Sequence, residues 1–161
     1  MWRRFCRRCA KSVPWMNKTT YEAYLEQQGE LTYTNVGTSM LPMLRQGRDL
    51  FTLTQKTAAR CKKYDVVLYR SPKNRYVLHR IVKVRAKDYV ILGDNCMRKE
   101  YGITDADILA VLTRFVHKGR EYAVTDGRYL FYARVWYALY PVRYALKRIA
   151  AVFRRIWRKI T

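Results

Sequence analysis

Three segments in the middle of the chain carry residue types that together suit nucleophilic catalysis. Ser39 lies in Gly37-Thr38-Ser39-Met40-Leu41-Pro42, His79 lies in a strand-like stretch, and Asp94 lies in Gly93-Asp94-Asn95. A serine hydroxyl is a weak nucleophile until a positioned base removes its proton, and imidazole titrates near neutral pH, where this transfer is efficient. A carboxylate that accepts the second ring N–H would hold the imidazole in place.

Each of these residues also has a purely structural interpretation. Ser39 taken alone fits an ordinary turn, and His79, beside Leu78 and Ile81, fits a histidine of the core. Asp94 fits a turn, because aspartate and asparagine favour turns for local reasons. The choice between catalysis and structure therefore depends on the segments that surround them.

Those segments resemble the type I signal peptidases and the related autocleaving repressor peptidases. The Ser-Met-x-Pro box of residues 39–42 is followed by Gly47-Arg48-Asp49. Further similarity lies, in the order typical of the family, at residues 64–69, 76–82 and 91–95, and weakly at residues 108–111. The bacterial branch has a lysine base in the third block, whereas the endoplasmic reticulum and archaeal branch has His-Arg, as His79-Arg80 does here. The resemblance covers residues 37 to about 115.

The resemblance implies a serine endopeptidase that cleaves a signal or leader peptide and needs no cofactor. Ser39 would be the nucleophile, with its backbone N–H in the oxyanion hole, and His79 would be the general base. Asp94 would hold the ring, and Glu100, where the family has a second aspartate, is a possible additional acid. Gly37 stands where relatives have a serine that assists the oxyanion hole.

Substrate contacts follow from the resemblance only close to the nucleophile. Met40 and Leu41 are the residues expected to contact the peptide. The family cleaves after small residues of an extended substrate, so the same preference is expected here.

The periodicity of the chain predicts a mainly β protein, a small signal-peptidase-like barrel or sandwich. A helix from about Thr20 should end at Gly29. Alternating, β-branched and aromatic residues predict strands near residues 31–36, 49–53, 65–69, 76–84, 89–92 and 108–115. We divide the chain into a basic extension with a short helix (1–29), a catalytic domain (30–125) and a basic, aromatic, helical tail (128–161).

The charge of the chain predicts a polyanionic partner. Lys and Arg number 33 against 12 Asp and Glu, which gives +21, and the excess gathers at the two ends. In the tail, an apolar helical face is opposed by a basic one, which is typical of helices that lie on anionic membranes. Phe153, Trp157, Arg154 and Arg155 are the expected membrane contacts. The apolar positions of that face are Val142, Leu146, Ile149, Phe153, Ile156 and Ile160.

Two alternatives stay open. The apolar face of the tail would instead pack on the catalytic domain or on a partner helix. The whole chain would instead be a non-catalytic protein that binds nucleic acid through a degenerate peptidase-like barrel, with its arginines on phosphates and its tyrosines stacked on bases.

The remaining sequence features bear on compartment and metal binding. Cys6 and Cys9 have the spacing of half a zinc site, but no second ligand pair follows, so no metal is expected. Four cysteines are too few for a disulfide framework, and no signal peptide or apolar span is evident. We expect a peripheral protein on the cytoplasmic face of a membrane. Met16 is a second possible start of translation.

Overall fold

The computed structural model of the chain describes residues 21–160, with side chains up to Trp157. The basic residues before Met16, the Cys6 and Cys9 pair and Met16 itself lie outside the described residues, as does the side chain of Ile160. The predictions that rest on them are not addressed by the structure.

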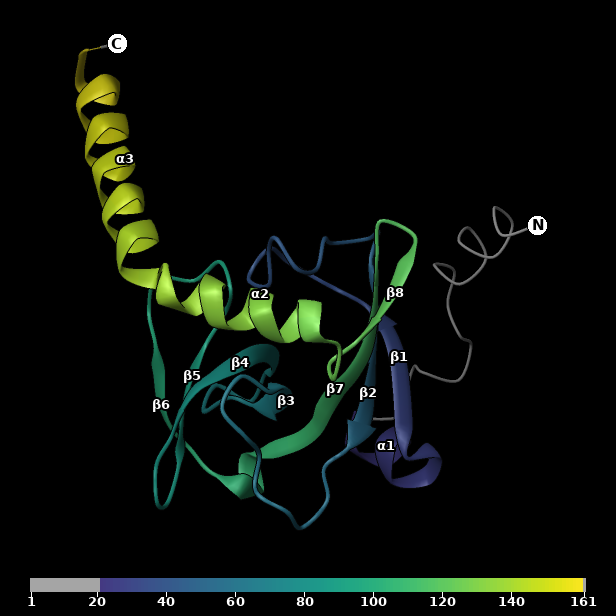
Figure 1. The fold of residues 1–161 in the computed structure, drawn as a ribbon. Helices are drawn as coiled ribbons and strands as arrows, with labels where there is room; N and C mark the ends of the chain where they lie inside the picture. Colours follow the sequence, from purple (N-terminus) through teal and green to yellow (C-terminus); the bar gives the residue numbers. More distant parts are fainter. Residues whose placement is uncertain (1–20, 161) are drawn as a thin grey trace.

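The described chain forms eight strands, two helices at its C-terminal end and one short helix before the strands (Figure 1). In chain order the elements are α1 (Tyr21–Gln28), β1 (Glu30–Thr34), β2 (Leu50–Gln55), β3 (Val66–Arg70), β4 (Tyr76–Val84), β5 (Tyr89–Leu92), β6 (Glu100–Ile103), the 3₁₀ turn η1 (Asp105–Asp107), β7 (Ile108–His117), β8 (Arg120–Ala123), α2 (Gly127–Ala138) and α3 (Tyr140–Ile160).

All strands pair antiparallel in one sheet of order β1-β2-β7-β3-β4-β5-β6, and β8 pairs with the end of β7. The sheet does not close on itself. Register shifts interrupt the pairing of β2, β3 and β4 with their neighbours, and such bulges bend strands. The prediction of a mainly β fold with a short leading helix and a helical tail is confirmed.

Strand β4 separates the two main clusters of the core. Successive residues of a strand point to opposite faces. Val77 and Ile81 accordingly join one cluster, with Tyr69, while Leu78 joins the other. His79 lies on the face of Val77 and Ile81, and Arg80 on the face of Leu78. This alternation decides which acid each of them can reach.

The two C-terminal helices behave differently. Helix α2 lies against the sheet, with Tyr129 and Ala133 buried, whereas α3 extends away from the body of the protein (Figure 1). The break falls at Leu139, and Pro141 sits in the first turn of α3, where a missing N–H has no partner to lose. None of the helices in the described part of the chain is both long and apolar enough to cross a membrane.

Candidate active site

The loop that carries Ser39 is tied down from two sides. Asn95 donates its backbone N–H to the Ser39 carbonyl at 2.7 Å and its side-chain amide to the Thr38 carbonyl at 3.1 Å. Met40, the next residue, is completely buried in the core. Because both neighbours are fixed, Ser39 is held at the surface of a cleft of about 770 Å³ that His79, Cys96 and Glu100 also line.

His79 projects from β4 into this cleft and is paired with Glu100 of β6. Its Nδ1 lies 2.9 Å from Glu100 Oε1 and 3.4 Å from the Tyr69 hydroxyl. The strand register explains the pairing, since Ile81, two residues after His79 on the same face, is opposite Ile91, and Ile91 is opposite Glu100. With Nδ1–H donated to the carboxylate, Nε2 is the nitrogen that can accept a proton.

The surroundings of the ring change its titration. Burial alone would lower the pKa of His79, but hydrogen bonds with Cys96 and Glu100 outweigh it and raise that pKa to about 9. The hydrogen bond from His79 in turn lowers the pKa of Glu100. Burial, and then the Glu100 carboxylate, raise the pKa of the Tyr69 phenol, so Tyr69 stays a neutral donor. A proton on His79 is therefore held more firmly than on a free imidazole.

The group in contact with His79 Nε2 is the thiol of Cys96, with Sγ at 3.9 Å. Within the described residues, the Ser39 hydroxyl makes no hydrogen bond to this nitrogen. Hydrogen bonds between nucleophile and base are often long before substrate binds, so the shared cleft is the relevant observation for Ser39. The sequence does not identify Cys96 as a site residue, because a single cysteine has no characteristic spacing.

Gly93 makes room for the approach of Cys96 to His79. A Cβ at this position would lie 2.6 Å from Cys96 Sγ and 2.8 Å from His79 Nε2, closer than real Cβ atoms come. Any side chain here would push the thiol and the ring apart.

Asp94, expected to hold the ring, lies instead against Arg80. Its two carboxylate oxygens accept from Arg80 Nε at 2.8 Å and Nη2 at 2.7 Å, and both residues are almost completely buried. The reason is the alternation along β4: Arg80 and His79 face opposite sides of the strand, so a carboxylate that binds Arg80 in this bidentate way cannot also reach the ring. The carboxylate that contacts the His79 ring is that of Glu100.

Asp94 also joins the sheet to the C-terminal helices. Tyr132 donates its hydroxyl to the Asp94 carboxylate at 3.1 Å, and Trp136 donates its indole N–H to the Asp94 carbonyl at 2.9 Å. Arg143 of α3 reaches the same carbonyl at 2.7 Å. Two aromatic residues of α2, Tyr132 and Trp136, thus bind this helix to Asp94.

Helix α3 also contacts Asn95, the residue that holds the Ser39 loop. Lys147, one turn after Arg143, donates to the backbone and side-chain oxygens of Asn95 at 2.5 and 2.6 Å. Since Asn95 holds Thr38 and Ser39, the first two turns of α3 support the Ser39 loop through a single residue. Beyond them, α3 leaves the body, and its apolar side chains are exposed.

The residues expected to touch substrate near Ser39 do not line the cleft. Met40 is in the core and Leu41 is only half-buried, but neither borders the cavity. The cleft wall is formed instead by the turn before β4, the first half of β4 and the segment from Cys96 to Glu100, and its charged members, apart from Glu100, are Lys73, Arg75 and Arg98. The Ser39 N–H has no acceptor among residues 21–160, as an oxyanion donor requires.

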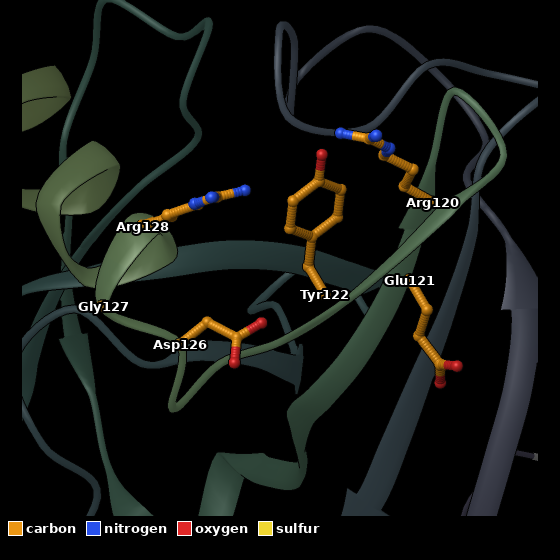
Figure 2. Close-up of a pocket in the computed structure, with 6 residues that line it drawn as sticks. All are labelled: Arg120, Glu121, Tyr122, Asp126, Gly127 and Arg128. Atoms are coloured by element: carbon orange, nitrogen blue, oxygen red, sulfur yellow. The ribbon is translucent and has the colours of Figure 1, made fainter.

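A second depression lies where β8 meets α2, and Figure 2 shows Arg120 and Arg128 on either side of the Tyr122 ring. Its Asp126 accepts the Ala123 N–H at 2.9 Å, and Tyr122 stacks on Phe115 with ring centroids 5.3 Å apart. Asp126 and Tyr122 are thus engaged in the local structure, and no serine, threonine, cysteine or histidine lines this hollow.

The described residues contain no cluster of three or more histidine, cysteine or acidic side chains arranged to hold a metal ion. No protein-family model matches the sequence, and no curated protein or solved structure matches it either. The function must therefore be argued from the site itself.

Proposed function

We propose that the protein is a serine endopeptidase in which His79, oriented by Glu100, removes the proton of the Ser39 hydroxyl. The observation that carries the proposal is the pairing of the buried His79 ring with the Glu100 carboxylate, 2.9 Å apart, in the same cleft as Ser39. A base held by a carboxylate through Nδ1, in one cleft with a serine, has the composition of a catalytic triad. The type I signal peptidase resemblance favours the same assignment.

The reaction would follow the usual course of acyl transfer. Ser39 Oγ attacks the peptide carbonyl as its proton passes to His79 Nε2, and the carbonyl oxygen, now negative, is stabilised by backbone N–H groups that include that of Ser39. His79 then gives the proton to the leaving amine. Water, deprotonated by the same nitrogen, releases the acyl group from Ser39 and restores the enzyme.

The first test is peptide cleavage by the purified full-length chain. A diverse mixture of synthetic peptides, including peptides with alanine and glycine before the scissile bond, is incubated with the protein and products are identified by mass spectrometry. The Ser39→Ala variant should give none of the products, and the matched Thr38→Ala variant, which removes the neighbouring hydroxyl, should give all of them. Cleavage by Ser39→Ala at the wild-type rate would refute the proposal.

We further propose that α3 holds the peptidase on an anionic membrane surface, where a signal or leader peptide would reach it. Leu146, Ile149 and Phe153 are exposed on its apolar face, and Arg154 and Arg155 are exposed on the same helix. Apolar insertion and attraction of basic side chains to lipid headgroups add, at about 1 kcal/mol per basic residue near the surface. The exposure of these apolar side chains does not favour the alternative in which this face packs on the catalytic domain.

Vesicle co-sedimentation tests the membrane role. Phe153→Ser should release the protein from anionic vesicles, because a large apolar side chain is worth about 1.5 to 3 kcal/mol when fully buried. Phe131→Ser is the matched control, since Phe131 of α2 is as exposed as Phe153, at 69% against 67%. Equal release by both variants, or equal binding of the wild type to duplex DNA and to vesicles, would overturn the membrane role.

The pairing of the buried His79 ring with Glu100 weighs against the nucleic-acid alternative. Phosphate binding needs exposed cations and base stacking needs exposed aromatic rings. Neither interaction requires a buried histidine that is paired with a carboxylate.

A further inference from the structure

The thiol of Cys96 completes a second catalytic-type constellation around the same histidine. Sγ lies 3.9 Å from His79 Nε2, and Glu100 lies 2.9 Å from His79 Nδ1. This is the order of nucleophile, base and orienting acid that activates cysteines. Gly93, which has no side chain to separate the two groups, is placed where the thiol and the ring approach each other.

A cysteine whose thiol lies beside an imidazole is activated as a nucleophile, as in Cys–His pairs. Cys96 lines the cleft, so reagents that enter the cleft reach it. Cys61 has the opposite environment: it is buried, and burial raises its pKa to about 11. The two described cysteines should therefore differ strongly in reactivity.

We propose that Cys96 is a modification site at which an anionic low-molecular-weight disulfide reversibly blocks the cleft. The Cys96 thiolate attacks one sulfur of the disulfide, the S–S bond breaks, and one half stays bonded to Sγ. The other half leaves as a thiolate and takes up a proton from His79 or from water. The disulfide is itself the oxidant, so the exchange needs no other. The exposed Lys73, Arg75 and Arg98 on the cleft wall favour an anionic reagent.

The adduct would close the site that the proposed function uses, and in this respect the inference rests on that function. A group bonded to Sγ stands against His79 Nε2, the nitrogen that must accept the Ser39 proton. An excess of free thiol would reverse the exchange and reopen the cleft.

The experiment uses the reduced full-length chain and oxidised glutathione at pH 7. Intact mass and peptide mapping follow the adduct on each cysteine, and peptide cleavage is measured on the same samples. Cys96 should react about tenfold or more faster than in the urea-unfolded chain, because only the folded chain places His79 Nε2 beside its thiol, while Cys61 stays unmodified. His79→Gln should slow the Cys96 reaction by a similar factor.

The variants separate the adduct from its consequence. Cleavage by the wild type should fall in step with the Cys96 adduct and return with excess dithiothreitol, whereas Cys96→Ser should keep its own starting activity in oxidised glutathione. Arg98→Glu should slow the reaction with glutathione but not with the cationic disulfide cystamine.

Cys96 reacting no faster than in urea would overturn the modification site, as would a full adduct that leaves cleavage unchanged. Equal slowing of both reagents by Arg98→Glu would overturn the preference for an anion. A wild type that cleaves no peptide would refute the proposed peptidase, and the adduct rate would still decide the status of Cys96.

Discussion

The two histidines of the chain are both bonded to a carboxylate through Nδ1, yet the two pairs are built in opposite ways. In the His79–Glu100 pair the ring is buried, at 8% exposure of its side chain, and the acid is partly exposed, at 36%. In the His117–Asp49 pair, 2.6 Å apart, the acid is buried, at 1%, and the ring is the more exposed member, at 22%.

The difference shows which partner serves the other. Asp49 Oδ2 accepts from His117 and from the backbone N–H of Arg45, so the ring helps satisfy a buried carboxylate that fixes the turn after the Ser39 box. Glu100 instead holds a buried ring whose second nitrogen faces the cleft. A histidine–carboxylate contact is thus not a catalytic sign by itself, and the environment of Nε2 decides.

The largest expected effect separates the two histidines. His79→Gln should reduce peptide cleavage on the order of 10⁶-fold, as loss of a triad base does in serine peptidases, while His117→Gln should leave turnover nearly unchanged. Steady-state kinetics with thermal melts of both variants makes the measurement. Equal loss of turnover in two folded variants would mean that the pairs do not differ as we argue.

Substitutions of the two acids near the site should differ in their effects, since one should lower turnover and the other should lower stability. Glu100→Gln should lower kcat on the order of 10⁴-fold by favouring the wrong imidazole tautomer, with little change in urea unfolding. Asp94→Asn should instead destabilise the fold by about 3 to 5 kcal/mol, because Arg80 would be left as a buried charge without its partner. If Asp94→Asn lowered kcat more than Glu100→Gln in the folded fraction, Asp94 would be the acid that matters.

A smaller effect concerns pH. The base must be neutral to accept the Ser39 proton, so kcat should rise with pH and level off above the His79 pKa of about 9. Cys96→Ala removes one contact that raises this pKa, so the rising limb should move to lower pH. The pH–rate profiles of the two proteins give the comparison, and a limb that does not move would separate Cys96 from the titration of His79.

The same pKa has a consequence for stability. A histidine whose pKa is about 9 in the folded chain and near 6.5 when unfolded stabilises the fold fully below pH 6.5, and this contribution is lost as pH rises through 9. The free energy of unfolding should therefore fall between those values, and less so in His79→Gln.

The sequence predicts the bounds of a strand best where most of the strand is buried. Strands 76–84 and 89–92 have the predicted bounds, because apolar and β-branched residues fill them. Strand β6 was not predicted, since only Ile103 of its four residues is buried and Gly102 has a φ of +77°. Strand β8 was not predicted either, since none of its four residues is fully buried. Short edge strands carry little of the apolar pattern that identifies central ones.

The structure brings some of the predicted site residues together and separates another from them. Ser39, His79 and Glu100 line one cleft, as the resemblance implies, whereas Asp94 is bonded to Arg80. The period of a strand places His79 and Arg80 on opposite faces, but the sequence alone does not tell which acid crosses to which face. The contacts of Trp136, Arg143 and Lys147 depend on how α2 and α3 dock, which no local pattern encodes.

The most direct test of the account asks which atom carries the acyl group during turnover. The full-length chain is mixed with the nitrophenyl ester of a short peptide that ends in alanine, quenched in acid within the first turnover, and mapped by mass spectrometry. Ser39→Ala serves to subtract acylation of lysines. We predict an ester on Ser39 in the wild type and its absence in the variant. An acyl group found on Cys96, with Ser39 unmodified, would contradict the account and make Cys96 the nucleophile.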